Sequence, residues 1–306
     1  MAQDYPMERM EIIISDGMSD DGTREIISEI QKQYSNIKMI DNPKKIVAAG
    51  LNQAIREARG EVIVRVDGHT LIAKDYVRQC VEALKDSKWD VVGGPIVTVG
   101  ETYLAQVIAI AMSSVFGVGG SAFRTIRDQE MESETVPFPA YRRNLFERAG
   151  LFDEELVRNQ DDEHNYRIRK QGGHILLTPR IQSQYYSRST LKSLWMQYFQ
   201  YGYWKVRVLQ KHPGQMKMRQ FIPPLFTFCL ISAAILYGFG FPRLWSAILF
   251  LYVLANLAAS VRLAAQYGWK YFGLLPVIFF ILHLSYGIGF LTGLVQFSNR
   301  WGQVQP

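Results

Sequence analysis

Residues 48–70 read AAGLNQAIREARGEVIVRVDGHT and contain helix, strand and acidic-turn signals in immediate succession. Within the helical part, Leu51 and Ile55 repeat at the spacing of one helix face. The following run, EVIVRV (61–66), is rich in β-branched residues, which favour a strand. Asp67 and His69 come directly after it. Open α/β sheets bind their ligands beyond the carboxyl ends of strands, so this turn is a candidate ligand site.

The same alternation of strand and helix signals extends through residues 11–93. We expect strands at 11–15, 37–41, 61–66 and 89–94, and helices at 23–34, 46–58 and 75–86. Such alternation predicts an α/β fold whose sheet is mostly parallel and covered by helices on both faces. Asp16 follows the first of these strands just as Asp67 follows the third, which makes it a second candidate at the ligand-binding edge.

Charge is divided unevenly along the chain. All 28 acidic residues precede residue 164, whereas 15 of the 34 lysines and arginines follow it. A basic, acid-free segment indicates contact with an anionic membrane or with nucleic acid. The basic residues stand beside long apolar runs and not on a separate domain, so we expect a membrane lipid partner and no nucleic-acid partner. The chain has two cysteines, which suits a reducing cytosol.

Three apolar runs in the C-terminal part have the length of membrane helices, at about 221–241, 244–261 and 272–294. The alternative is three buried helices of a soluble bundle. Basic residues gather just before the first run, namely Lys205, Arg207, Lys211, Lys217 and Arg219. By the positive-inside rule they place the domain before the first run in the cytoplasm. We expect a multi-pass protein of the bacterial inner (plasma) membrane. We therefore divide the chain into a cytoplasmic domain, 1–220, and a membrane domain, 221–306.

Three segments before these runs have their own character. Residues 104–118 are apolar but too short to span a bilayer comfortably, and we expect a buried or membrane-surface helix. Residues 119–135 are polar and are expected to form a mobile loop near the site. Residues 190–211 mix aromatic and basic side chains, which predicts an interfacial helix at the headgroup layer.

A second chemical cluster lies at Asn159-Gln160-Asp161-Asp162-Glu163-His164, the expected start of a helix. Adjacent carboxylates repel one another and suit a general base. Taken alone, the cluster is better explained as helix capping and dipole compensation. Asp67 and His69, taken alone, are likewise better explained as a turn residue and a solvated imidazole.

The order of these features resembles the family-2 inverting glycosyltransferases, and within them the succinoglycan-type exopolysaccharide transferases (the ExoA type). The resemblance covers most of residues 3–220. It is carried by four stretches: IIISDGMSDDGT (12–23), AAGLNQAIREARGEVIVRVDGHT (48–70), NQDDEHNYRIRKQGG (159–173) and LWMQYFQYGYWK (194–205). It implies a Rossmann-like GT-A glycosyltransferase domain followed by C-terminal transmembrane helices.

The resemblance also implies roles for particular residues. Asp161 would be the catalytic base, and Asp16 would contact the base of the nucleotide. Asp67 would bind the diphosphate through Mg²⁺ or Mn²⁺, and His69 stands where many relatives carry a second Asp as metal ligand. Asp162 and Gln197 would complete the nucleotide-sugar site.

Two departures from the family pattern shape the expectation. Processive relatives carry Gln-x-x-Arg-Trp where this chain has Gln200-Tyr201 after Gln197, which favours a single transfer over polymer synthesis. Family members also open with a strand and helix that this chain lacks before Gln3. A missing central strand exposes two sheet edges, so we expect the chain as it stands to fold poorly and to be weakly active.

The function we expect is inverting transfer of a sugar from a nucleotide-sugar, a UDP-sugar, to a polyprenyl-linked saccharide in exopolysaccharide or cell-envelope polysaccharide biosynthesis. Two alternatives stay open. One is a processive polysaccharide synthase. The other is an N-terminally truncated, non-catalytic remnant that at most binds nucleotide.

Overall fold

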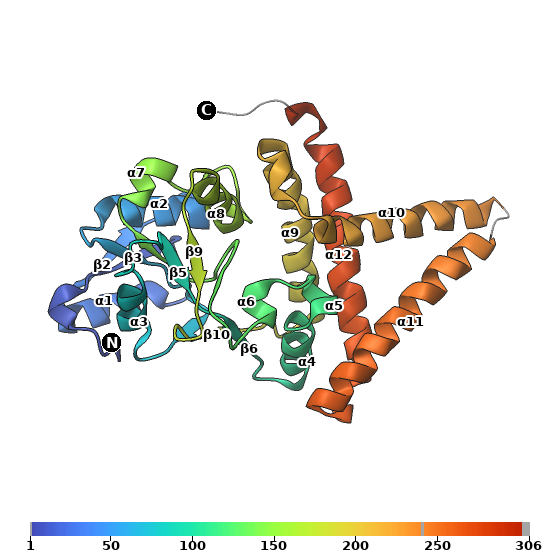
Figure 1. Ribbon diagram of the computed structural model, residues 1–306, viewed down its shortest axis with the longest axis horizontal. Coiled ribbons are helices and arrows are strands. Elements are labelled where there is room, and N and C mark those ends of the chain that lie inside the picture. Colours follow the sequence, from blue (N-terminus) through green and yellow to red (C-terminus); the bar gives the residue numbers. More distant parts are fainter. Residues whose placement is uncertain (1, 240–241, 302–306) are drawn as a thin grey trace. The chain divides into compact units, whose positions relative to one another are not determined.

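The computed structural model describes residues 2–239 and 242–301 (Figure 1). Packing divides the chain into two compact units, residues 1–96 with 126–184, and residues 97–125 with 185–306. The chain passes to the second unit within β6 (Ile96–Val99), returns to the first after Thr125, and passes to the second again within β10 (Ser183–Tyr186). By packing, residues 97–125 and 185–220 group with the C-terminal helices. The division at residue 220 into a cytoplasmic and a membrane domain remains a prediction.

The first unit is an α/β structure. Every strand and helix predicted over 11–93 is present, with bounds shifted by a few residues. In chain order the structure has β1 (Ile12–Asp16), α1 (Thr23–Gln33), β2 (Ile37–Asp41), α2 (Val47–Glu57), β3 (Val62–Val64), β4 (Thr70–Ile72), α3 (Tyr76–Ala83) and β5 (Val91–Gly93), of which β4 was not predicted. After the excursion into the second unit come β7 (Met131–Glu132), β8 (Ala140–Arg142), α7 (Leu145–Ala149), α8 (Gln160–Lys170) and β9 (Ile175–Leu177).

The strands form mixed sheets, and the prediction of a mostly parallel sheet is wrong. β1 and β2 pair in parallel, and a three-stranded sheet has the order β4-β10-β6. The five-stranded sheet has the order β3-β8-β5-β9-β7, in which the neighbours β5 and β9 are parallel and the other three neighbouring pairs are antiparallel. The polarity changes because β8 enters antiparallel between β3 and β5. β8 lies outside the stretch 11–93 on which the prediction rested.

The core of the first unit forms where this sheet meets its helices. Val91 and Ile175, register partners in β5 and β9, are both fully buried, as is Ile168 of α8. Continuous apolar strands of this kind are typical of a sheet covered on both faces. α8 stops at Lys170, and Gly172 follows with φ +78°, a left-handed conformation that glycine adopts at little cost.

The second unit is helical. Its helices are α4 (Tyr103–Met112), α5 (Val115–Val118), α6 (Ala122–Thr125), α9 (Leu191–Lys211), α10 (Met218–Gly238), α11 (Pro242–Tyr267) and α12 (Leu275–Gln296). Within the described residues, three are long and apolar enough to cross a membrane: Met218–Gly238, Trp245–Tyr267 and Leu275–Gln296. Residues 240 and 241 of the first predicted run lie outside the described residues.

Residues 104–118 and 119–135, considered above, both contain regular secondary structure. α4 is largely buried within its unit, with Val107, Ile108 and Met112 fully covered, in agreement with the buried-helix alternative. The predicted mobile loop 119–135 instead contains α6 and β7.

A close backbone crossing joins α9 to α12, which lie side by side in Figure 1. A Cβ added at Gly202 would stand 2.0 Å from the carbonyl oxygen of Tyr286, and one at Gly289 would stand 2.0 Å from that of Phe199. A Cβ at Gly293 would meet the Tyr203 carbonyl oxygen at 2.7 Å. Small residues allow this approach, as they do between membrane helices. Each helix therefore supplies glycine where the other supplies a backbone oxygen.

Gly202→Ala should destabilise the second unit, because the new methyl group meets backbone atoms that cannot move aside cheaply. Overpacking of this kind costs about 1–3 kcal/mol, so the midpoint of thermal unfolding in detergent should fall by several degrees. Gly273→Ala is the matched control in the same unit, since nothing lies within 4 Å of its added Cβ. Equal midpoints for the two variants would contradict this account of the crossing.

Candidate functional site

Asp16 and Asp41 lie next to each other at the ends of two parallel strands. They are the last residues of β1 and β2 and are register partners. Arg24 of α1 neutralises both: its Nη1 lies 2.7 Å from Asp16 Oδ2 and its Nη2 lies 2.7 Å from Asp41 Oδ1. The backbone N–H of Ser19 also donates to Asp16 Oδ2, at 2.9 Å. The loop after β1 therefore wraps the Asp16 carboxylate with donors.

These donors keep Asp16 ionised. Hydrogen bonding from Ser19, with a further contribution from Arg24, lowers the pKa of Asp16 to about 2. Its side chain is only 4 % exposed, whereas Asp41 is 57 % exposed. Asp16 is thus a fixed negative acceptor at the sheet edge, as an amide or imide N–H of a nucleotide base would require.

Arg65 brings two further predicted residues together. Its Nε donates to Asp67 Oδ1 at 2.8 Å and its Nη2 donates to Asp67 Oδ2 at 2.9 Å. Its Nη1 lies 4.0 Å from Asp161 Oδ2. The guanidinium is buried, Asp67 is 22 % exposed and Asp161 is 46 % exposed. Burial alone would lower the pKa of Arg65, but Asp67 and Asp161 outweigh it and raise that pKa, so Arg65 is a permanent cation between them.

Local geometry explains how Asp161 reaches this position. It lies in the first turn of α8, whose preceding residue, Asn159, has φ +63°. Non-glycine residues adopt this left-handed conformation rarely, and such residues cluster at functional sites. Behind Asp161, Glu163 is buried and paired with Arg167 at 2.6 Å. Of the three consecutive acids, Glu163 is thus part of the core, while Asp161 and Asp162 are half-buried.

His164 completes the core beneath this turn. Its Nε2 lies 2.9 Å from the carbonyl oxygen of Gly150, so Nε2 carries the proton and donates. Its ring packs against Phe146 and Phe152. Burial lowers the pKa of His164 to about 4, and the imidazole is therefore neutral at physiological pH. It supports the base of α8 and offers no charge to a substrate.

The predicted metal ligands can hold a cation only with help from a substrate. Among the described residues, no group of three or more His, Cys, Asp or Glu side chains has the arrangement of a metal site. Asp67 nevertheless has a free lone pair on each oxygen beyond those that Arg65 uses. His69 is exposed two residues further on. Mg²⁺ is commonly held by one or two carboxylates together with phosphate oxygens, so Asp67 and His69 fit a cation shared with a diphosphate.

Gln197 lies in the other unit, on α9. Its Nε2 donates to the hydroxyl groups of Tyr185 and Tyr201, at 2.9 and 3.0 Å. Its predicted part in the nucleotide-sugar site remains a prediction, as does that of Asp162.

Sequence reasoning missed the two arginines that organise the site. Arg65 could have been found from the sequence, because it is the one charged residue in VIVRV (62–66), an otherwise apolar run. A cation at that place needs a partner. The role of Arg24 could not have been found in this way, since an arginine in the first turn of a helix is ordinary.

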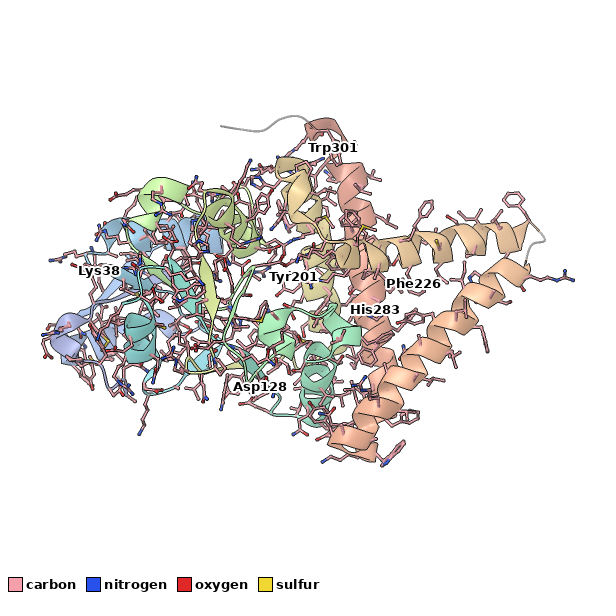
Figure 2. The ribbon with its side chains drawn as sticks, viewed as in Figure 1. Lys38, Asp128, Tyr201, Phe226, His283 and Trp301 are labelled. Atoms are coloured by element: carbon pink, nitrogen blue, oxygen red, sulfur yellow. The ribbon has the colours of Figure 1, made fainter. Side chains whose placement is uncertain are left out.

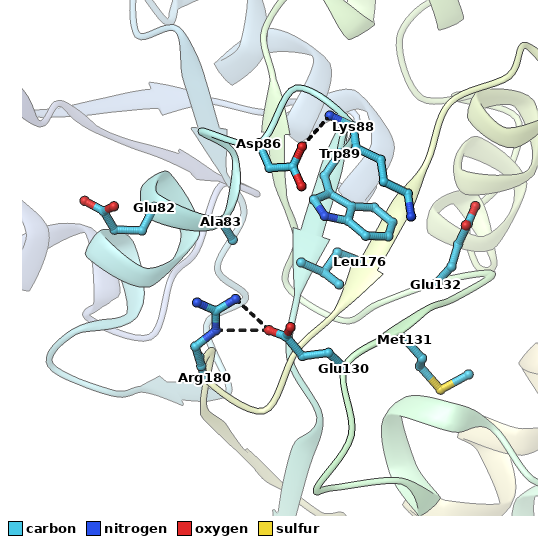
Figure 3. A pocket seen from close by; sticks show the side chains of 10 residues that line it. All are labelled: Glu82, Ala83, Asp86, Lys88, Trp89, Glu130, Met131, Glu132, Leu176 and Arg180. Atoms are coloured by element: carbon cyan, nitrogen blue, oxygen red, sulfur yellow. Dashed lines mark hydrogen bonds and ion pairs between the residues drawn. The ribbon is translucent and has the colours of Figure 1, made fainter.

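The first unit also has an open cavity of about 500 Å³, separate from these residues (Figure 3). It lies beside the end of α3 and the edge strand β7, and its lining includes an ion pair in which Arg180 Nη2 lies 2.6 Å from Glu130 Oε1. Its remaining lining residues are Glu82, Ala83, Asp86, Lys88, Trp89, Met131, Glu132 and Leu176. None of the predicted site residues lines it.

Comparison with known proteins identifies the family. Residues 1–150 match Glycosyl transferase family 2. The Succinoglycan biosynthesis protein ExoA of Rhizobium meliloti (strain 1021) is 31% identical over 94% of this chain and 87% of its own. The chain belongs to glycosyltransferase family 2. It is therefore a glycosyltransferase, and the predicted α/β domain of GT-A type followed by apolar C-terminal helices is confirmed.

Another relative of this family-2 glycosyltransferase matches almost its full length. This relative, from Methanococcus voltae, is 29% identical over 98% of this chain and 92% of its own, and is named dolichyl N-acetyl-alpha-D-glucosaminyl phosphate 3-beta-D-2,3-diacetamido-2,3-dideoxy-beta-D-glucuronosyltransferase. Among solved structures, S. aureus TarS 1-349 has a TM-score of 0.47 and 16% identity over 99% of this chain and 85% of that chain.

Asp67→Asn should destabilise the first unit more than Asp161→Asn. The Asn amide oxygen can still accept from Arg65, but the carboxylate that faces the buried guanidinium is then Asp161, 4.0 Å away, and loss of the close charged partner of a buried charge costs about 3 kcal/mol. Without Asp161, both hydrogen bonds to Asp67 remain, so the loss should stay below about 1 kcal/mol. Chemical denaturation of the two purified variants measures the difference. A larger loss for Asp161→Asn would contradict the assignment of Arg65 to Asp67.

Asp16 should stabilise the protein only above acidic pH. Its pKa is lowered in the folded state, so its contribution is complete above about pH 4 and is lost as the pH falls toward 2. The unfolding midpoints of the parent and Asp16→Asn should therefore differ at pH 6 and converge near pH 2. Asp20→Asn, an exposed neighbour in the same loop, serves as the control. A difference that persists unchanged to pH 2 would show that Asp16 acts through packing and not through its charge.

Proposed function

We propose that this glycosyltransferase inverts the anomeric centre of a nucleotide-sugar, a UDP-sugar, as it transfers the sugar to a lipid-linked saccharide. The observation that carries this proposal is the buried Arg65, which lies between the carboxylates of Asp67 and Asp161. It gives two neighbouring acids different surroundings. Asp67 is held by two hydrogen bonds, whereas Asp161 is more exposed and has only a 4.0 Å contact.

On the donor side, Asp16 accepts from the nucleotide base and Asp67 faces the diphosphate. A divalent cation, Mg²⁺ or Mn²⁺, held by Asp67 and His69 would neutralise negative charge on the leaving diphosphate. Arg65 orients the Asp67 carboxylate for this task, because its two parallel N–H groups fix the carboxylate plane. Each Asp67 oxygen has a second lone pair that could bind the cation on the donor diphosphate.

On the acceptor side, Asp161 acts as the general base. It removes the proton of an acceptor hydroxyl, and the oxygen then attacks the anomeric carbon from the face opposite the leaving diphosphate. Nearly half of the Asp161 side chain is exposed, which gives an acceptor access to it. Asp162, next to it at the helix start, would complete the nucleotide-sugar site.

The acceptor class comes from the relatives and from the helices. The Methanococcus voltae relative is named for a dolichyl phosphate-linked sugar, and the Rhizobium meliloti relative for succinoglycan biosynthesis. Three helices here are long and apolar enough to hold the enzyme at a membrane. A polyprenyl-linked saccharide in exopolysaccharide or cell-envelope polysaccharide biosynthesis fits both observations.

We place the enzyme in the bacterial inner membrane with the catalytic domain in the cytoplasm, on the side of the basic residues that precede the first apolar run. Two of these, Lys205 and Arg207, are each only 3% exposed, so they are held within the second unit. The cytoplasmic orientation is therefore supported by Lys211, Lys217 and Arg219, of which Lys217 is exposed and the other two are half-buried.

The decisive experiment follows UDP release from UDP-sugars with Mg²⁺ or Mn²⁺, using membranes that contain the full chain and its lipid acceptors. Asp161→Asn should lower the turnover rate by about 10²–10⁴, the usual contribution of a general base. Asp67→Ala should also lose most activity. Asp128→Asn is the control, because Asp128 is an exposed acid of the same unit (labelled in Figure 2). Its rate of UDP release should equal that of the parent.

Three results would change the assignment. Full activity of Asp161→Asn would remove the general-base role from Asp161. A product that grows by many sugars in each encounter would favour a processive synthase. A folded parent that binds UDP but releases none from any donor would favour a non-catalytic binding protein.

A further inference from the structure

The second unit has far more positive than negative charge. Residues 97–125 and 185–306 contain twelve lysines and arginines but a single acidic residue, Glu101, which is exposed. An arginine that lies partly buried in this unit therefore cannot readily find a carboxylate within it. Any buried or half-buried guanidinium here is a candidate for an anion brought by a ligand.

Arg124 of α6 is such a guanidinium. Its Nη1 has a long hydrogen bond, 3.4 Å, to Thr98 Oγ1, and its Cζ lies 5.4 Å from the centre of the Phe123 ring and 5.5 Å from that of Tyr185. Within the described residues it makes no ion pair. Aromatic faces stabilise a cation without using up its N–H donors. Most of the hydrogen-bonding capacity of Arg124 is thus left over.

A buried amide next to this guanidinium is also incompletely paired. Gln197 is 92% buried, and its Nε2 donates to the hydroxyl groups of Tyr185 and Tyr201 while its Oε1 has no partner. Exchanging the amide nitrogen and oxygen would let both hydroxyl groups donate instead, and the nitrogen would then lack a partner. In either arrangement one polar atom of a buried side chain is unsatisfied. Such atoms are rare and call for an explanation.

We infer that Thr98, Arg124, Tyr185, Gln197 and Tyr201, together called the Arg124 cluster, bind the phosphate or diphosphate group of the lipid-linked acceptor. A guanidinium provides parallel N–H donors that match phosphate oxygens, and hydroxyl and amide groups can add further hydrogen bonds. The cluster is built within the unit that contains the three candidate membrane helices, which favours a phosphate carried by a lipid over the phosphates of a soluble nucleotide. This inference rests on the proposed function for the identity of the acceptor.

The test measures binding without turnover. The full chain in detergent is titrated with a short-chain polyprenyl diphosphate, with the matching polyprenol that has no phosphate, and with UDP. Arg124→Gln should weaken binding of the polyprenyl diphosphate by about tenfold or more, as expected when a charge-assisted hydrogen bond is lost. Binding of the polyprenol and of UDP should stay within about twofold of the parent.

Two further variants keep the result interpretable. Arg262→Gln removes the same charge from an exposed position of α11 in the same unit and should bind all three ligands as the parent does. Arg124→Lys keeps the positive charge but loses the planar donors, so it should fall between the parent and Arg124→Gln. If Arg124→Gln does not fold, as judged by its unfolding midpoint, Arg124→Lys provides the same comparison.

Unchanged binding of the polyprenyl diphosphate by Arg124→Gln overturns the inference. So does a loss confined to UDP, which would move the cluster to the donor. Failure of the catalytic proposal has a different signature, since full activity of Asp161→Asn would leave these binding constants untouched. An active enzyme that binds the polyprenyl diphosphate equally well with Arg124 and with Gln at this position would refute this inference and leave the proposed function standing.

Discussion

One buried guanidinium, that of Arg65, holds two of the candidate site residues. Arg65 follows β3, whose three residues are all apolar, and burial of its charge is tolerable only because Asp67 meets it with both oxygens. Asp67 in turn is held in one orientation. The start of α8 then has to bring Asp161 near the same cation, and the left-handed Asn159 is part of how the chain accomplishes this. Without Arg65, the segment that follows β3 and the start of α8 would lose the cation that both of their carboxylates face.

Negative and positive charges are distributed unequally between the two units. The first contains nearly all of the acids, arranged at strand ends and at a helix start, where arginines hold them in place. The second contains one acid and a surplus of bases among aromatic rings. Carboxylates suit a cation, a base and a proton transfer, whereas a unit with a single acid and many bases suits anionic lipid. Under the proposed function, the division seen in composition would correspond to a division of chemical tasks.

Much of the first unit could be predicted from sequence because its elements follow simple periodicities. Helix and strand alternate over 11–93, and Asp16 and Asp67 follow strands that any reading of β-branched runs would find. The direction of β8 could not be predicted, because Ala140–Arg142 is too short to show a period and its polarity is set by strands far away in the chain. The arginine partners of Asp16 and Asp67 were hidden for a related reason: which cation meets a given carboxylate depends on side-chain direction in the folded chain. Local sequence likewise could not show that Lys205 and Arg207, which read as surface charges, are buried.

The glycine contacts between α9 and α12 have a consequence for exchanging parts among relatives. Backbone oxygens of each helix fill the space that a side chain of the other would need, so neither surface can be changed by itself. Residues 191–211 and 275–296 thus behave as one inseparable cassette, although more than 60 residues lie between them. A chimaera that transplants α9 from another transferase must transplant α12 with it.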